Sequence, residues 1–431
     1  MAKKLINSRR FLPMFLTQFF GAFNDNVYKY ALLMVFTYGW IARGDMEIST
    51  LNNVAALLFI LPFFIFSATA GQLADRYERA QLIRGLKFGE VIIMLIASLG
   101  FFIGNLWLLL FALFLMGTQS AFFGPIKYAM LPDILHEDEL MTGNALFQSG
   151  TSLAILLGMV LGGIVISFST GNMWWICLTL ITIAICGYLS SRMILKQKIA
   201  DPNLKVNWNF FATSWQIIRL SYSLPLIFLI LMANSWYWFY GAALITQIPQ
   251  MTQQYLHGNE NVSSVVLTFF SIGVVIGSAL CKKWSGKHIN IKLVPLGVLG
   301  LTIFAFYLAW ALAHVPTQQG DYLNIMQTFG QGLAYYHVFA AVTLLGISGG
   351  FYIVPLYAMM QAKSPAAQRA RLVAANNIFN AIFMVTAAIF CIIILSVLAL
   401  SLVHLFIITA LLSAVISGLL VIHIRKHLRT A

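Results

Sequence analysis

Long apolar segments recur along the whole chain and alternate with short polar or basic stretches. Most of them are about 20 residues long, which lets an α-helix cross roughly 30 Å of hydrocarbon while satisfying its own backbone hydrogen bonds. The pattern therefore predicts an all-α membrane protein with twelve transmembrane helices. The predicted spans are 11–40, 51–73, 85–104, 106–131, 144–168, 172–193, 223–250, 260–281, 289–314, 337–362, 372–398 and 401–424.

Composition and charge agree with a membrane location. Of the 431 residues, 60% are hydrophobic and 9% are charged, which excludes an ordinary water-soluble protein. The formal charge of +13 would suggest nucleic acid as a partner, but 23 of the 26 Lys and Arg residues fall at the two ends of the chain and in alternate loops, or within four residues of them. Only Arg43 lies in an opposite loop, and Lys29 and Lys127 lie within spans. By the positive-inside rule both termini are cytoplasmic, and no nucleic-acid partner is expected.

The N-terminal segment and the cysteines give no sign of a signal peptide, a disulfide or a metal site. Residues 1–10 run directly into the first apolar segment without a small-residue cleavage site, so we expect no cleaved signal peptide. The four cysteines fall in or beside spans without paired spacing, which favours packing over disulfide or metal chemistry.

The two halves of the chain repeat one another. Residues 122–130 carry two aromatic residues, a proline and Tyr-Ala-Met in the same order as residues 351–359. This repeat predicts two six-helix bundles of similar topology, as a carrier that opens to each side in turn would need. We therefore divide the chain into an N-terminal bundle at 1–193, a cytoplasmic linker with an amphipathic helix at 194–222, and a C-terminal bundle at 223–431.

A charged loop follows the second predicted span. Residues 71–79 read Gly-x-x-x-Asp-Arg-x-x-Arg. Asp75 can accept hydrogen bonds at the N-terminus of a neighbouring helix, and Arg76 or Arg79 can pair with carboxylates, so the three residues are candidate gating residues that lock one conformation. A solvated loop is the alternative. In the second half Cys281 stands where the aspartate would be, which makes a second latch doubtful.

The first span carries polar residues in its middle, at Asn24, Asp25, Asn26 and Lys29. A charge at this depth is costly, so the stripe that contains Asp25 and Lys29 should face the bundle interior or a wet cavity. These four residues are candidate substrate-binding residues. The alternative is a structural ion pair between Asp25 and Lys29, which are four positions apart.

Lys127 is the second cation within a span, and it follows Gly117, Ser120 and Gly124 at helical spacing. We expect these small residues to leave a groove beneath its ammonium group, although the side chain could instead extend to the membrane interface. Glu90, three positions after Lys87, is expected to form a structural pair.

Later spans supply three further candidate substrate-binding residues. Gln148 continues a polar stripe on the fifth span, where hydrogen bonding between helices explains it equally well. Trp236 and Tyr240 share one face of the seventh span and could form a wall for an acyl chain or headgroup; a lipid-facing aromatic belt is the alternative.

Motifs for enzymatic chemistry are absent from the sequence. There is no Walker loop, Cys or His metal cluster, nucleophile elbow, or His-x-x-x-x-Asp acyltransferase centre. We therefore expect a transporter that is not an enzyme and uses neither cofactor nor metal.

The loop at 71–79 resembles the signature of the major facilitator superfamily. Residues 20–29 (Phe-Gly-Ala-Phe-Asn-Asp-Asn-Val-Tyr-Lys), 124–128 (Gly-Pro-Ile-Lys-Tyr) and 351–356 (Phe-Tyr-Ile-Val-Pro-Leu) resemble the bacterial lysophospholipid transporters and the transporter half of their acyltransferase fusions. The resemblance implies a monomer in the bacterial inner membrane that flips lysophospholipid, such as lysophosphatidylethanolamine, toward the cytoplasmic leaflet. A cytoplasmic lysophospholipid acyltransferase is an implied partner.

One departure and two alternatives remain open. The seventh span contains no charged residue, so headgroup recognition should rest on the N-terminal half. A proton-coupled exporter of amphipathic small molecules, with Asp25 as the proton carrier, is the competing transport function. A membrane enzyme acting on lipids is disfavoured by the missing acyltransferase centre.

Overall fold

The computed structural model describes the chain except residues 1–4, 39–47, 170–172, 287–288, 319 and 431. Within the described residues it is helical without strands, and the twelve expected spans correspond to twelve long helices. Eleven helical segments are long and apolar enough to cross a membrane by length and composition. The twelfth, α2, runs from Leu12 to Tyr38 and contains Asp25 and Lys29. Arg43 and predicted span ends 39–40 and 172 lie outside the described residues.

The chain folds as two compact units. Unit 1 comprises Met1–Glu137, Leu153–Ser223 and Lys363–Ile378, and unit 2 comprises Asp138–Ser152, Leu224–Ala362 and Phe379–Ala431. The division into two six-helix bundles with a linker at 194–222 stays a prediction from the internal repeat. Two helices are shared between the units. The beginning of α6 (Leu140–Phe168) belongs to unit 2, and the beginning of α15 (Arg369–Ile392) belongs to unit 1.

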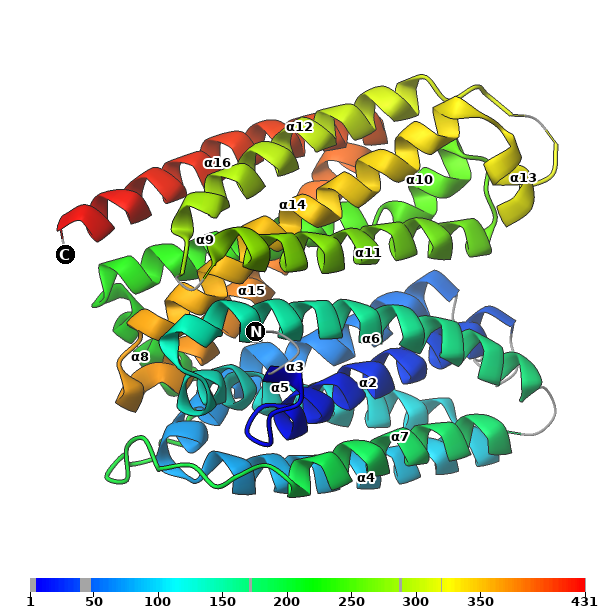
Figure 1. The fold of residues 1–431 in the computed structure, drawn as a ribbon. Helices are drawn as coiled ribbons and strands as arrows, with labels where there is room; N and C mark the ends of the chain where they lie inside the picture. Colours follow the sequence, from blue (N-terminus) through cyan, green and yellow to red (C-terminus); the bar gives the residue numbers. More distant parts are fainter. Residues whose placement is uncertain (1–4, 39–47, 170–172, 287–288, 319, 431) are drawn as a thin grey trace. The chain divides into compact units, whose positions relative to one another are not determined.

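In unit 1, α3 packs on α5, and α7 packs on both α2 and α4. Figure 1 shows α4 and α7 side by side. The helices that contribute to unit 1 are α2 (Leu12–Tyr38), α3 (Ile48–Arg76), α4 (Arg79–Ile103), α5 (Leu106–Ile134), α6 (Leu140–Phe168), α7 (Trp174–Arg192), α8 (Phe210–Tyr222) and the start of α15 (Arg369–Ile392).

Local sequence explains where several of these helices begin and end. Glu78 caps α4 by accepting hydrogen bonds from two backbone N–H groups of its first turn. Gly104 ends α4 in the left-handed conformation, with φ 65°, and Asn105 directly caps α5. Asn209 caps α8 by accepting a hydrogen bond from the backbone N–H of Ala212, so a helix lies within the segment predicted as the linker.

In unit 2, α16 packs on α12 and α9, and Figure 1 shows α12 and α16 side by side. The predicted seventh span, 223–250, falls within the candidate membrane span Pro225–Tyr255, in which the backbone turns after Ile245 and a short helix, α10, follows at Ile248–Tyr255. The helices that contribute to unit 2 are α9 (Pro225–Ile245), α10 (Ile248–Tyr255), α11 (Glu260–Ser285), α12 (Val294–Ala313), α13 (Ile325–Gly330), α14 (Leu333–Lys363), α16 (Leu402–Thr430) and the remaining parts of α6 and α15.

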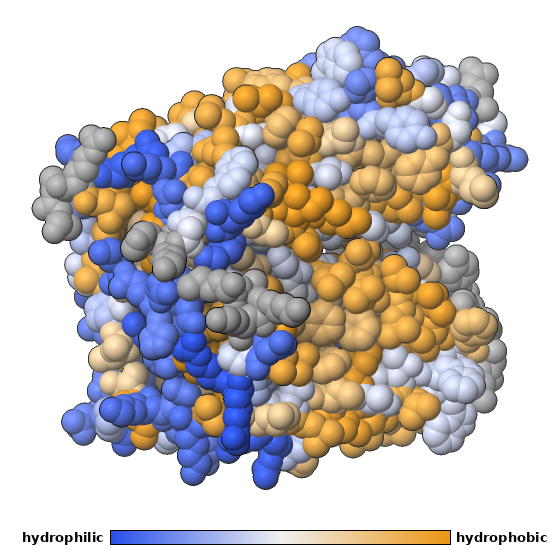
Figure 2. Space-filling model, in the orientation of Figure 1, coloured by the Kyte–Doolittle hydropathy of each residue, from blue (hydrophilic) through white to orange (hydrophobic). Residues whose placement is uncertain are grey.

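The helix surfaces match a lipid environment. Bulky apolar side chains such as Leu95, Phe111 and Leu299 are more than half exposed on the helix shafts. In Figure 2 apolar residues cover much of these shafts, and hydrophilic residues gather at the end that carries the connection between α7 and α8. Because exposed apolar surface of this kind is favourable only in hydrocarbon, the protein is a multi-pass membrane protein.

Candidate functional site

A buried charged cluster joins α2, α4 and α5 in unit 1. Lys87 and Glu90 are fully buried and form an ion pair, with 2.6 Å between Nζ and Oε2. Asn24 donates to the other Glu90 oxygen at 3.2 Å, and Gln119 donates to Oε2 at 3.1 Å. The expected structural role of Glu90 is confirmed. Lys87, which the predicted span 85–104 already contains, lies inside the helix packing and is the partner in this pair.

Gly21 makes room for the Lys87 ammonium. A Cβ atom at Gly21 would lie 2.3 Å from Lys87 Nζ, so a larger residue here would displace the ammonium group from its present position. Lys87 Nζ also lies 4.6 Å from the centroid of the Phe123 ring on α5. Gly21, in the polar stripe of α2, therefore leaves space for the ammonium group of Lys87 from α4. The sequence pattern did not predict this contact.

Asp25 faces α5. Its Oδ2 accepts a hydrogen bond from Ser120 at 2.9 Å, and its Oδ1 is buried without a hydrogen-bond partner among the described residues. Lys29 lies 4.4 Å from the ring centroid of Phe59 on α3. The alternative of an ion pair between Asp25 and Lys29 is wrong for the described structure, because the two side chains turn to different helices. The stripe does face the helix packing, as expected.

Lys127 is partly exposed and lies over two aromatic rings, at 5.6 Å from the Phe123 centroid and 5.2 Å from that of Tyr128. It forms no ion pair within the described residues. The expectation that Gly117 and Gly124 leave an open groove beneath this ammonium group is wrong for these two glycines. Gly117 abuts the Phe59 carbonyl and Gly124 abuts the side chain of Asn377, so both glycines serve close packing.

The five ionisable groups of the cluster do not cancel. Lys29, Lys87 and Lys127 oppose Asp25 and Glu90, which leaves a formal charge of one positive unit. Only Lys87 and Glu90 are joined as an ion pair within the described residues. Because uncompensated charge at this depth is costly, the two remaining lysines favour a site for an anionic group.

The other candidate binding residues are held in different ways. Asn26 donates to the carbonyl of Ala22 on its own helix, at 2.7 Å. Gln148 lies in unit 2 and is partly exposed on α6. Trp236 and Tyr240, also in unit 2, are each 3% exposed. This small exposure is inconsistent with the aromatic-belt alternative for these two residues.

Packing accounts for both aromatic residues of α9. The Trp236 indole donates to the Ser413 hydroxyl at 3.3 Å, and its ring stacks on Phe239. Tyr240 donates to the carbonyl of Leu301 at 2.9 Å. Their role as a wall for a ligand stays a prediction, since these contacts explain both side chains without one.

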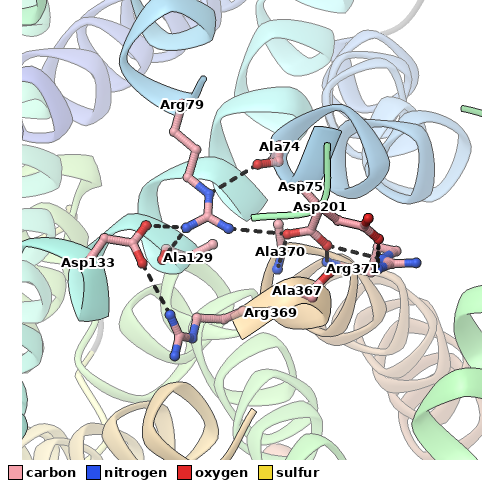
Figure 3. A network of polar contacts seen from close by, with 10 residues as sticks. All are labelled: Ala74, Asp75, Arg79, Ala129, Asp133, Asp201, Ala367, Arg369, Ala370 and Arg371. Carbon is pink, nitrogen blue, oxygen red and sulfur yellow. Dashed lines mark hydrogen bonds and ion pairs between the residues drawn. The ribbon is translucent and has the colours of Figure 1, made fainter. Parts of the chain in front are cut away.

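The candidate gate lies at the end of α3, and Figure 3 shows its polar contacts. Asp75 is fully buried and accepts hydrogen bonds from the backbone N–H groups of Ala370 and Arg371, at 3.1 and 3.3 Å. Arg371 Nε and Arg79 also reach the carboxylate, at 3.1 and 3.2 Å. Asp75 thus binds the N-terminus of α15, where the helix dipole favours negative charge.

Two further carboxylates complete this gate. Asp133, near the end of α5, pairs with Arg79 and, at 3.2 Å, with Arg369. Asp201, from the connection between α7 and α8, pairs with Arg371 at 3.2 Å. In Figure 3 the three carboxylates alternate with the three arginines. Arg76 forms no ion pair within the described residues, so the geometry supports Asp75 and Arg79 as latch residues and gives Arg76 no such contact.

Gly71 permits the close approach of α3 to α15. A Cβ atom there would lie 2.7 Å from Ala374 Cβ and 3.0 Å from the backbone of Arg371. The glycine at the start of the motif at 71–79 therefore has a steric reason. Sequence reasoning missed Asp133, Asp201, Arg369 and Arg371 as partners, because they lie 58 to 296 positions from Asp75 and no local pattern links them.

Comparison with known proteins decides the family. The profile of the Major Facilitator Superfamily matches residues 14–388. The chain belongs to the major facilitator superfamily. The family expected from residues 71–79 is thereby confirmed.

Relatives of this superfamily member extend the resemblance over most of its length. The chain is 24% identical over 380 residues to the lysophospholipid transporter LplT of Yersinia enterocolitica, covering 84% of this chain and 81% of the relative. It is 24% identical over 375 residues to LplT of Yersinia pestis, with the same coverage. The resemblance to lysophospholipid transporters noted in the sequence is confirmed at this level.

Solved structures support the fold. The human organic anion transporter MFSD10 superposes with a TM-score of 0.75 at 12% identity, covering 96% of this chain and 99% of that one. The fucose:proton symporter FucP of E. coli superposes with a TM-score of 0.72 at 13% identity, and the superposition covers 97% of this chain and 99% of FucP. At these identities the likeness concerns the fold alone, and it agrees with the twelve helices described above.

Proposed function

We propose that this protein is a secondary transporter that flips lysophospholipid across the bacterial inner membrane toward the cytoplasmic leaflet by alternating access. The observation that carries the proposal is the positively charged cluster of α2, α4 and α5, in a chain similar to lysophospholipid transporters. A lysophospholipid combines a charged headgroup with one acyl chain, and it needs a polar site within the membrane to cross it.

The chemistry of the cluster fits such a headgroup. Lys127 and Lys29 form no close ion pair within the described residues, and the single carboxylate of Asp25 is the anion that acts on both, so they can attract a phosphate. Asp25 has one oxygen without a hydrogen-bond partner there, so it can accept from an ethanolamine ammonium group. Asn24 and Asn26 flank Asp25 on α2 and donate to Glu90 and to the carbonyl of Ala22.

Several parts of this proposal come from the sequence and its relatives. We propose that both termini are cytoplasmic, that the protein acts as a monomer without cofactor or catalytic activity, and that a cytoplasmic lysophospholipid acyltransferase consumes the transported molecule. The distribution of Lys and Arg supports the orientation, and the resemblance to transporters fused to acyltransferases supports the partner.

The test is transfer of labelled lysophosphatidylethanolamine in inverted membrane vesicles. Asp25→Asn and Lys127→Gln should each lower the transfer rate about tenfold or more at equal expression, because each removes a charge-assisted contact worth roughly 1.5–3 kcal/mol. Lys198→Gln, which removes an exposed linker charge, is the control and should retain the parent rate. Full activity in both cluster variants would exclude the proposed route.

A proton-coupled exporter of amphipathic small molecules is the second candidate, and the unpartnered Oδ1 of Asp25 favours it. In that case transport of a lipophilic cation would follow an imposed pH gradient, and Asp25→Asn would abolish this dependence. Transfer of lysolipid that does not respond to the gradient, together with no drug transport, would support the first proposal over this one.

A further inference from the structure

A second basic site lies in unit 1 outside the charged cluster and the gate. It is a cleft of about 570 Å³ between the beginning of α4, the end of α7 and the first residues after α7. Arg84, Arg192 and Lys196 line it together with Phe88 and Tyr188. Neither Asp75 nor any residue of the cluster around Glu90 lines this cleft.

The positive charge of the cleft is poorly compensated. Glu78 is the only carboxylate among its lining residues, and it already accepts hydrogen bonds from Ala80, Gln81 and Gln197 backbone N–H groups, at 2.9 to 3.0 Å. Three cations against one carboxylate leave two formal positive charges. The cleft is therefore suited to an anion.

The guanidinium group of Arg84 has one N–H donor, at Nε, without an acceptor among the described residues. One terminal nitrogen donates to the carbonyl of Ile194 at 2.8 Å, while Nε is buried without a hydrogen-bond partner in the part of the chain that the structure describes. A buried, unsatisfied guanidinium donor is unfavourable unless a ligand or water accepts from it. Arg192 and Lys196 are exposed and form no ion pair with described residues.

Apolar surface continues from the cations along the same two helices. Phe88, Ile92, Leu95 and Leu99 are exposed at helical spacing on α4, and Leu189 is exposed on α7. Phe88 also packs on Tyr188, with ring centroids 5.8 Å apart. A free phosphate would use only the cations, whereas a membrane lipid would use the cations for its headgroup and this apolar surface for its acyl chains.

We propose that this cleft binds the phosphate headgroup of an anionic diacyl phospholipid of the surrounding membrane, at a site separate from the transport path. The lipid is a bound component of the protein and is not transported. Arg84, Arg192 and Lys196 hold the headgroup, and the exposed apolar residues of α4 and α7 contact its acyl chains.

The bound lipid is connected to the gate through the linker. Ile194 and Gln197 contact the cleft residues Arg84 and Glu78. Four positions after Gln197, the backbone N–H of Asp201 donates to the carbonyl of Asp75 at 2.8 Å, and its carboxylate pairs with Arg371. Lipid that orders residues 194–197 therefore stabilises the linker segment that contacts the gate.

The experiment measures thermal stability of the purified full-length protein with added phosphatidylglycerol, phosphatidylcholine of the same acyl chains, or inorganic phosphate. We expect phosphatidylglycerol to raise the melting temperature, and the variant R192Q/K196Q to require at least about tenfold more lipid for the same shift. This variant keeps Arg84 and its bond to Ile194, so the linker contact is preserved. The charge-matched control K198Q/K205Q lies in the same linker outside the cleft and should respond like the parent.

Four outcomes would overturn the assignment. These are an equal response to phosphatidylcholine, an equal response to inorganic phosphate, an unchanged response of R192Q/K196Q, and an equal loss in K198Q/K205Q. Lys127→Gln separates this site from the proposed transport site, because it should keep the full response to phosphatidylglycerol. A lost response in Lys127→Gln would place the lipid in the charged cluster instead.

Discussion

Glu90 is the residue on which the buried cluster of unit 1 depends. It accepts from Lys87, Asn24 and Gln119, which come from three different helices. A carboxylate deep among apolar helices is stabilised only by such donors, and each donor would in turn lack an acceptor without it. The pair of Lys87 and Glu90 therefore fixes the packing around Asp25, while Oδ1 of Asp25 has no hydrogen-bond partner among the residues that the structure describes.

Removing the Glu90 charge should destabilise the protein. Glu90→Gln keeps the size of the side chain but leaves the buried Lys87 ammonium without its counter-ion, so we expect the free energy of unfolding in detergent to fall by about 3–5 kcal/mol. Glu137→Gln, at an exposed position, should change it by less than about 0.5 kcal/mol. Equal stability of the two variants would contradict the structural role of Glu90.

At the scale of helices, small residues set how closely neighbours approach. On α11, a Cβ atom at Gly273 would lie 2.2 Å from the carbonyl oxygen of Thr343, and one at Gly277 would lie 2.1 Å from that of Ile347. Both contacts are with the backbone of α14, the most buried of the candidate spans. Backbone approach of this kind stabilises helix pairs in a membrane, where apolar burial between helices contributes little.

Gly277→Ala tests this helix contact. The added methyl group cannot fit without moving α11 away from α14. We therefore expect the free energy of unfolding in detergent to fall by about 1–3 kcal/mol. Gly418→Ala, on α16, is the matched control because nothing lies within 4 Å of its Cβ position. It should be neutral or stabilising by up to about 1 kcal/mol, owing to helix propensity. A stable Gly277→Ala protein would refute the close packing.

At the scale of the whole molecule, the candidate gate around Asp75 joins residues from the two halves of the sequence. Asp75 belongs to the first half and Arg371 to the second, and they form part of one compact unit. A transporter that alternates between two states must break and remake such contacts, and their strength sets the population of each state. The loop motif therefore acts through a partner nearly 300 positions away.

Weakening the gate should expose the residues beneath it. Ala374 is fully buried and lies against Gly71. A cysteine introduced there should react slowly with a water-soluble maleimide, and adding Asp75→Asn should raise the labelling rate at least about fivefold, because the ion pairs with Arg79 and Arg371 are lost. The parent with its four native cysteines gives the background rate, and unchanged labelling would count against a latch.

Orientation is also a property of the whole molecule. A fluorescent protein fused after the last residue should fluoresce, and alkaline phosphatase at the same position should be inactive, because the basic segments keep both termini in the cytoplasm. Phosphatase fused after Thr317, in the connection between α12 and α14, should be active. The reverse pattern would show that the positive-inside prediction is wrong.

The sequence by itself determined the class of protein, the twelve helices and the family. The length of each apolar segment determines whether it can span the bilayer, and the distribution of Lys and Arg determines its orientation. Both depend on one segment and its flanks, so the spans and their orientation can be predicted without tertiary contacts. The inward direction of the Asp25 stripe followed for the same reason. The sequence also predicted that Asp75 accepts hydrogen bonds at a helix N-terminus, because the helix dipole favours a carboxylate there.

Only the tertiary structure decided which residues are partners. It placed Lys87 in the buried cluster around Glu90, turned Asp25 and Lys29 to different helices, and brought Asp133, Arg369 and Arg371 into the candidate gate. Residues that are neighbours on one helix can turn to different helices, and carboxylates far apart in sequence can share one arginine. These pairings depend on the rotation and register of packed helices, which hydrophobic periodicity alone does not specify.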